Sequence, residues 1–373
     1  MGEIHQSLNK KLGEAAPSAD DISVIMSQLL SIEAVRSAST STEHIFDRYK
    51  RNRKQKKQRA LANPLAIKAP LFDPDQLLNK LIPFVRPCFT PAAGCVWLFA
   101  VLSACLLALS NFSALSAAVN SDIFAPGNIV AMALLFVLIK VVHEFAHAFT
   151  VKMWGGEVHE MGITLLVLMP IPYVDASASA SFRDKNKRML VSAAGIASEL
   201  FIASIALFVW LAVEPGLVKD TALNTLLIAS VSTLLFNANP LLRFDGYYIL
   251  QDFAEIPNLY SRAGKYYLYL IQRYLFGLDS ARSPVTAAGE RRWFATYGLA
   301  AFFYRFIILF TIVMFLAEEY LVVGVALGCW AVIMQILLPL GKGLRYLQAS
   351  PALAGKRKRA IRVSGAMTAV ILA

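Results

Sequence analysis

Long apolar stretches constrain this chain more than any other feature of its sequence. A transmembrane helix needs about 20 predominantly apolar residues. The chain of 373 residues is 57% hydrophobic and 16% charged, with a mean hydropathy of +0.54, whereas soluble domains carry roughly 25% charged residues. The sequence therefore predicts an all-α polytopic membrane protein with about six complete transmembrane helices, near residues 93–117, 128–150, 189–213, 222–240, 296–316 and 320–340.

A seventh apolar stretch follows a basic cluster at residues 356–359. It begins near Val363, and the sequence ends at Ala373, which is about half of a span. We therefore expect a truncated seventh transmembrane helix and a longer natural chain.

The basic residues are distributed unevenly between the loops. Residues 151–188, 241–295 and 341–362 are rich in Lys and Arg, as is the N-terminal region, whereas residues 118–127 contain neither. The positive-inside rule then predicts a multi-pass protein of the cytoplasmic (inner) cell membrane, with its N-terminus in the cytoplasm. The same pattern accounts for the net charge of +11 without a nucleic-acid partner.

The segment between the second and third predicted spans has an unusual composition. Gly155 and Gly156 end the helix, and an apolar run at residues 163–169 leads into Pro170 and Pro172. The run is too short to cross a bilayer. We expect a short extended or β segment there, shielded by protein and able to pair with an unwound substrate strand.

The second predicted span carries an H-E-x-x-H motif, His143 to His147. Histidines four residues apart share one face of a helix and can bind one metal ion. Glu144 can then handle a proton of a water molecule that the metal activates. Ionisable groups in apolar surroundings are costly and are usually functional. The motif predicts a Zn²⁺ site, and the alternative is a pair of buried, hydrogen-bonded histidines.

A zinc hydrolase needs a third protein ligand, and Asp245 is the best candidate. Pro240 ends the fourth predicted span, and Gly246 permits a tight turn. Irregular backbone at membrane depth is tolerated where it faces protein or a watery cavity. The alternative for Asp245 is an ordinary loop carboxylate that caps a turn.

Three further charged residues lie in the predicted spans. Lys140 precedes His143 by one turn, and we expect it to extend to the membrane interface, with oxyanion stabilisation as the alternative. Glu199 requires a polar partner, either for helix packing or for catalysis. We expect Arg305 to pair with an acid or to reach lipid headgroups.

These motifs together resemble the site-2 protease family of intramembrane zinc metalloproteases (peptidase M50 type). That family combines H-E-x-x-H with a later N-x-x-P and D-G, which match Asn237 to Pro240 and Asp245–Gly246. The resemblance covers about residues 125–255. It implies zinc ligation by His143, His147 and Asp245, with Glu144 as the catalytic acid–base. It also implies that the Asn237–Pro240 segment, with Asn239, shapes the site or holds substrate.

A narrower resemblance is to a bacterial branch of peptide zinc metalloproteases that often carry a haemolysin-D-like adaptor domain. It implies a membrane-embedded or membrane-associated peptide or protein substrate, and an export-system adaptor or transporter as a further partner. The alternative function is a non-proteolytic membrane component of a peptide or protein export system that retains the fold.

The resulting organisation has five parts. They are a cytoplasmic N-terminal segment with a basic linker and an interfacial helix (1–90), an intramembrane metalloprotease core (91–255), a cytoplasmic loop (256–295), an additional transmembrane helix pair (296–340), and a basic loop with the truncated span (341–373).

Overall fold

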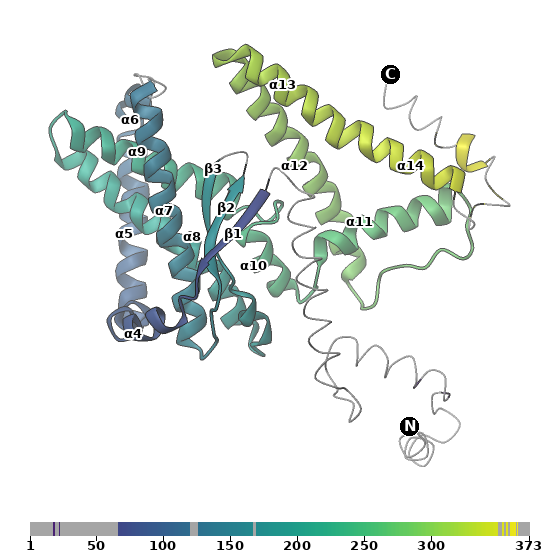
Figure 1. Ribbon diagram of the computed structural model, residues 1–373, viewed down its shortest axis with the longest axis horizontal. Coiled ribbons are helices and arrows are strands. Elements are labelled where there is room, and N and C mark those ends of the chain that lie inside the picture. The colour runs from purple at the N-terminus through teal and green to yellow at the C-terminus, as the bar shows by residue number, and fades with distance from the viewer. Residues whose placement is uncertain are drawn as a thin grey trace. The chain divides into compact units, whose positions relative to one another are not determined.

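The fold is mainly helical and contains one small sheet (Figure 1). A computed structural model describes residues 66–119, 126–166 and 169–349 continuously, and otherwise residues 18, 22, 353, 356, 359–362 and 364. The basic run predicted at residues 48–59, and nearly all of the predicted seventh span, lie outside the described residues.

Two compact units make up the chain. One comprises Met1–Lys68 and Leu165–Leu168, and the other comprises Ala69–Thr164 and Met169–Ala373. The second unit holds every helix and strand discussed below, apart from the ends of strands β1 and β2.

Five helices are long and apolar enough to cross a membrane. They are α5 (Pro91–Ser110), α7 (Pro126–Met153), α8 (Lys185–Ala212), α12 (Glu290–Glu319), and a continuous helix formed by α13 (Leu321–Val332), a π-helical turn (Ile333–Leu337) and α14 (Leu338–Ala349). These helices and the composition are those of a membrane protein, and they correspond to five of the six predicted spans.

The predicted fourth span differs from the prediction. Its helix α9 (Leu217–Ser232) has 16 residues and begins after Gly216, and a π-helical turn (Thr233–Asn237) continues it. Lys219, Asp220 and Thr221 occupy its first turns, so its regular apolar part is shorter than a span needs. Among the described residues, five helices are both long and apolar enough to cross a membrane, so the sixth predicted span is not confirmed.

Helix α8 is the centre of the helical core. Of the most apolar stretch of α8, 39% of the residues are buried, whereas in α5 only 6% are. Ala203 of α8 packs with Ile139 of α7 and Ile228 of α9. On another side, Trp97 of α5 donates a 2.8 Å hydrogen bond to the Ala197 carbonyl of α8. Helices α5, α7 and α9 thus all pack against α8.

The extended segment predicted between the second and third spans forms two strands, β2 (Met161–Leu166) and β3 (Met169–Val174). The sheet order is β1-β2-β3, and β1 (Ala66–Phe72) comes from the N-terminal region. The sequence did not predict β1, because Pro70 within it argues against a strand. The central strand is β2, so among the described strands β3 has one edge without a strand partner.

The helix predicted near residues 77–85 is α4 (Asp75–Val85). Its Leu78 is fully buried against Val151 of α7 and Val158, while Phe84 is exposed. Asp75 ties α4 to the end of α7 through Lys152 at 2.8 Å. Further along the chain, residues 256–295 are a structured connection that contains α11 (Leu259–Leu270), and α11 packs on α12.

Candidate metal centre

Two histidines of α7 face each other inside the helical core. His143 and His147 lie one turn apart, and their Nε2 atoms are 3.0 Å apart. Both side chains are buried, and the rings meet edge to face. The helix continues unbroken through the motif, as predicted, because no Gly or Pro interrupts it between Asn128 and Met153.

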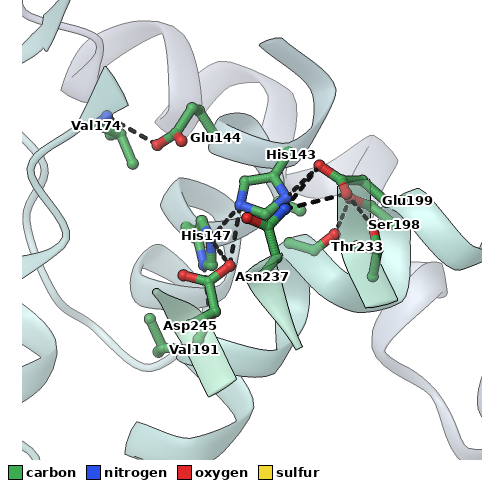
Figure 2. A network of polar contacts seen from close by, with 12 residues as sticks. His143, Glu144, His147, Val174, Val191, Ser198, Glu199, Thr233, Asn237 and Asp245 are labelled. Carbon is green, nitrogen blue, oxygen red and sulfur yellow. Dashed lines mark hydrogen bonds and ion pairs between the residues drawn. The ribbon is translucent and has the colours of Figure 1, made fainter. Parts of the chain in front are cut away.

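Asp245 completes a three-residue cluster with these histidines. It is the first residue of α10 (Asp245–Ala254), and its Oδ2 atom lies 3.0 Å from Nε2 of His143 and 3.4 Å from Nε2 of His147. The three side chains come from elements about a hundred residues apart in the chain, and Figure 2 shows them pointing toward one another. The structure therefore brings together the three residues that the sequence predicted as metal ligands.

The arrangement of these three atoms fits a divalent metal ion. Zinc bonds to imidazole nitrogen and carboxylate oxygen measure about 2.0–2.2 Å, so ligand atoms around one tetrahedral ion lie about 3.2–3.5 Å apart. The observed separations of 3.0–3.4 Å are close to this range. In addition, Oδ2 of Asp245 is buried without a hydrogen-bond donor. Among the described residues, no other group of three or more His, Cys, Asp or Glu side chains lies close enough together to hold a metal ion.

The backbone between α9 and α10 presents Asp245 through a tight turn. The Asn239 side chain accepts a 2.8 Å hydrogen bond from the Leu241 amide, and Pro240 ends helical pairing. A Cβ atom on Gly246 would lie 2.3 Å from the Ala238 carbonyl oxygen. Asn239 and Pro240 thus shape the turn that carries Asp245, whereas a contact with substrate stays a prediction.

Gly195 of α8 lies against the cluster, a role that was not predicted from the sequence. A Cβ atom at this position would lie 2.5 Å from Nε2 of both His143 and His147. Glycine lets the α8 backbone approach the two imidazoles closely. The available signal was a glycine inside an otherwise apolar helical pattern, which commonly has a packing or functional reason.

Glu199 supports His143 from the opposite side of the ring. Its Oε1 atom lies 2.8 Å from Nδ1 of His143, and it is fully buried. Thr233 and Asn237 donate hydrogen bonds to the same carboxylate, as Figure 2 shows. Asn237, predicted to shape the site or hold substrate, therefore donates its side-chain hydrogen bonds to Glu199.

Lys140 is the remaining partner of Glu199. Its Nζ atom lies 2.5 Å from Oε1, and the side chain is buried. Extension to the interface, the role expected from the sequence, is therefore wrong: a buried carboxylate needs a partner, and Lys140 supplies it inside the core. The predicted polar partner of Glu199 is present.

Glu144 points toward the sheet (Figure 2). Its Oε2 atom accepts a 2.9 Å hydrogen bond from the Val174 amide at the end of β3. The glutamate is thus tied to the strand and is not part of the three-residue cluster. Its predicted role as acid–base stays a prediction, and the contact with β3 is a feature that the sequence did not reveal.

The comparisons with known proteins give one relative. A protein of Bacillus subtilis (strain 168) named "Putative peptide zinc metalloprotease protein YydH" is 25% identical to this chain over 157 residues. The match covers 42% of this chain and 60% of the Bacillus protein, so the chain spans less than two thirds of that relative. No protein-family model matches the chain, and no solved structure matches it. The relationship is to a zinc metalloprotease-like protein.

Proposed function

We propose that this chain is an intramembrane zinc metalloendopeptidase of the site-2 protease type, which hydrolyses a peptide bond in or next to the membrane. The observation that carries the proposal is the convergence of His143, His147 and Asp245 on one point between membrane-type helices. The similarity to a protein named as a peptide zinc metalloprotease supports the same class of activity.

In this proposal the three clustered residues hold Zn²⁺ and leave one position for water. When bound, zinc would lower the pKa of water to about 7 and polarise the scissile carbonyl. Glu144 takes the proton of the attacking water and passes it to the leaving amine. Its Oε1 atom can do this while Oε2 keeps the Val174 amide.

The edge of β3 offers a surface for the unwound substrate. Pro170, Pro172 and Val174 occupy every second position of β3. The two prolines have no amide hydrogen, and the amide of Val174 donates its hydrogen bond to Glu144. These alternate positions face the same edge of a strand. An incoming strand would therefore pair mainly by donating its own amide hydrogens to β3 carbonyls. Asn239 and Pro240 would hold the turn that carries Asp245.

The proposed setting is the cytoplasmic cell membrane, with the N-terminus and the site on the cytoplasmic side. The excess of Lys and Arg in the loops that adjoin the site supports this orientation. The proposed partners are a membrane-embedded or membrane-associated peptide or protein substrate and an export-system adaptor or transporter.

Two substitutions test the activity and separate it from the alternative. We expect Glu144→Ala to abolish peptide cleavage in membrane vesicles, measured by mass spectrometry of the released peptides, while the zinc content stays at one ion per chain. We expect Asp245→Ala to lower the zinc content as well. The control is Glu214→Ala, which changes an exposed glutamate between α8 and α9 and should leave both readouts unchanged.

A non-proteolytic export component predicts a different result. In that case vesicles with wild-type protein and vesicles with Glu144→Ala would release the same peptides, and export of the natural partner would continue in both. Equal peptide release from the two proteins would therefore overturn the protease proposal.

A further inference from the structure

A cavity of about 660 Å³ lies between α11 and α12, away from the metal-binding cluster. Its walls combine apolar and aromatic side chains with two cations, and they include Tyr260, Lys265, Leu268, Tyr297, Phe302 and Arg305. The volume is within the range of small-molecule binding sites, about 300–1,000 Å³. The proposed protease function does not use this cavity.

Arg305 is the principal polar group in the cavity. It is the one charged residue between Arg292 and Glu318 in a helix of span length. It donates a hydrogen bond to the Tyr260 hydroxyl, and its guanidinium lies 5.1 Å from the centre of that ring. We expected Arg305 to pair with an acid or to reach lipid headgroups, and no carboxylate of the described residues lies at ion-pair distance from it.

A neighbouring arginine, in contrast, forms an ion pair within the chain. Arg262 of α11 lies 2.6 Å from a carboxylate oxygen of Glu290. Arg305 has no equivalent partner among the residues that the structure describes, although a charge inside a membrane-type helix is costly unless it is paired. The contrast indicates that the counter-charge of Arg305 comes from outside the described chain.

Two more cations adjoin the same cavity. Lys265 lines it and is exposed. Arg243 lies 5.7 Å from the centre of the Tyr260 ring. Neither has a carboxylate at ion-pair distance among the residues that the structure describes. Two cations thus line the cavity and a third contacts the Tyr260 ring in its wall, and none of the three pairs with a carboxylate among the described residues.

A buried hydroxyl adds a hydrogen-bonding group to the cavity wall. Tyr297 is 4% exposed, and its hydroxyl has no hydrogen-bond partner among the described residues. Its ring packs on Tyr247 of α10, and the hydroxyl of Tyr247 accepts a hydrogen bond from the Tyr260 amide. Contacts therefore connect the cavity wall to the helix that begins with Asp245.

We propose that this cavity binds an anionic phospholipid. The phosphate group would lie among Arg305, Lys265 and Arg243, because guanidinium and ammonium groups are the usual partners of phosphate oxygens. An acyl chain would contact Leu268, Leu299 and Phe302, which line the apolar part of the cavity. Basic pockets beside transmembrane helices are known sites for anionic headgroups.

Native mass spectrometry of the detergent-solubilised chain tests the proposal. The protein is titrated with phosphatidylglycerol, with phosphatidylcholine and with inorganic phosphate. We expect one saturable phosphatidylglycerol site, and for the Arg305→Gln, Lys265→Gln double variant a loss of affinity of about tenfold or more. The matched control is Arg345→Gln, which removes an exposed arginine from α14 and should bind as the wild type does.

Each contrary outcome overturns the proposal. Equal phosphatidylglycerol affinity of the double variant and the wild type would show that the cations do not form the site. Saturable binding of phosphatidylcholine with the same affinity would remove the requirement for an anionic headgroup, and displacement of the lipid by equimolar inorganic phosphate would indicate a free-phosphate site. Should Arg305→Gln fail to fold, Arg305→Lys with Lys265→Gln keeps one charge and is expected to bind with intermediate affinity.

Discussion

Oε1 of Glu199 lies 2.8 Å from Nδ1 of His143, while Oδ2 of Asp245 lies 3.0 Å from Nε2 of the same ring. The two carboxylates thus contact opposite nitrogens of one imidazole. A carboxylate on the outer nitrogen orients a metal-binding histidine and makes it a stronger ligand. Glu199 therefore has the geometry of a positioning residue for the proposed zinc site.

The first prediction concerns this contact. Glu199→Gln should weaken zinc binding by about 10–100-fold, because the amide contacts His143 less strongly than the carboxylate does. Competition with a chromophoric chelator measures the affinity independently of activity. Thr233→Val, which removes one donor to Glu199 but leaves its charge, should have a smaller effect. Equal affinities for the Glu199→Gln variant and the wild type would contradict the assigned role.

The second prediction concerns Lys140, which neutralises Glu199 in the core. Lys140→Met should destabilise the protein by about 3–5 kcal/mol, since it leaves a buried charge without its partner. Adding Glu199→Gln removes that charge, so the double variant should recover much of the lost stability in thermal unfolding. Its zinc affinity should nevertheless stay low. Recovery of both properties together would show that Glu199 acts only through charge balance.

The third prediction concerns Gly195. Gly195→Ala should displace His143 and His147, because the added methyl carbon would lie 2.5 Å from both Nε2 atoms. Overpacking of this kind costs about 1–3 kcal/mol, and zinc content should fall while the helical content stays the same. Gly94→Ala in α5 is the matched control: nothing lies within 4 Å of its added carbon, so it should be neutral or slightly stabilising.

The sequence predicted the parts of the site whose chemistry is carried by residue type and spacing. The H-E-x-x-H motif and Asp245 were identifiable because ionisable groups stand out against apolar surroundings. Gly195 and the Lys140–Glu199 pair were not, since their roles depend on which faces of α7 and α8 meet. Helix packing of this kind is a tertiary property that a single helix pattern does not contain.

The predicted fold was limited in the same way. Span-length apolar runs identified five helices, because a bilayer requires that length. The sixth span is not confirmed at α9, where polar residues occupy the first turns and a π-helical turn follows the regular helix. Strand β1 was missed because its pairing partner, β2, lies almost a hundred residues away.

The last prediction concerns pH and the attachment of α4. Asp75 binds the Lys152 ammonium at 2.8 Å and the Val158 amide at 2.9 Å. The hydrogen bond from Lys152 and then that from the Val158 amide hold the pKa of Asp75 below its ordinary value of 3.8. The folded state therefore favours the charged form, so the stability that this contact contributes is fully present above pH 3.8 and is lost as the pH falls through the lowered pKa.

Asp75→Asn removes this dependence. The difference in unfolding free energy between wild type and variant should be constant from pH 7 to about pH 5 and should shrink at lower pH. Denaturant unfolding in detergent at a series of pH values measures it. Lys80, an exposed residue of α4 without a resolved carboxylate contact, provides a control as Lys80→Gln, whose difference from the wild type should not change across the same pH range. A difference for Asp75→Asn that stays constant down to pH 2 would show that the carboxylate charge does not fasten α4 to α7.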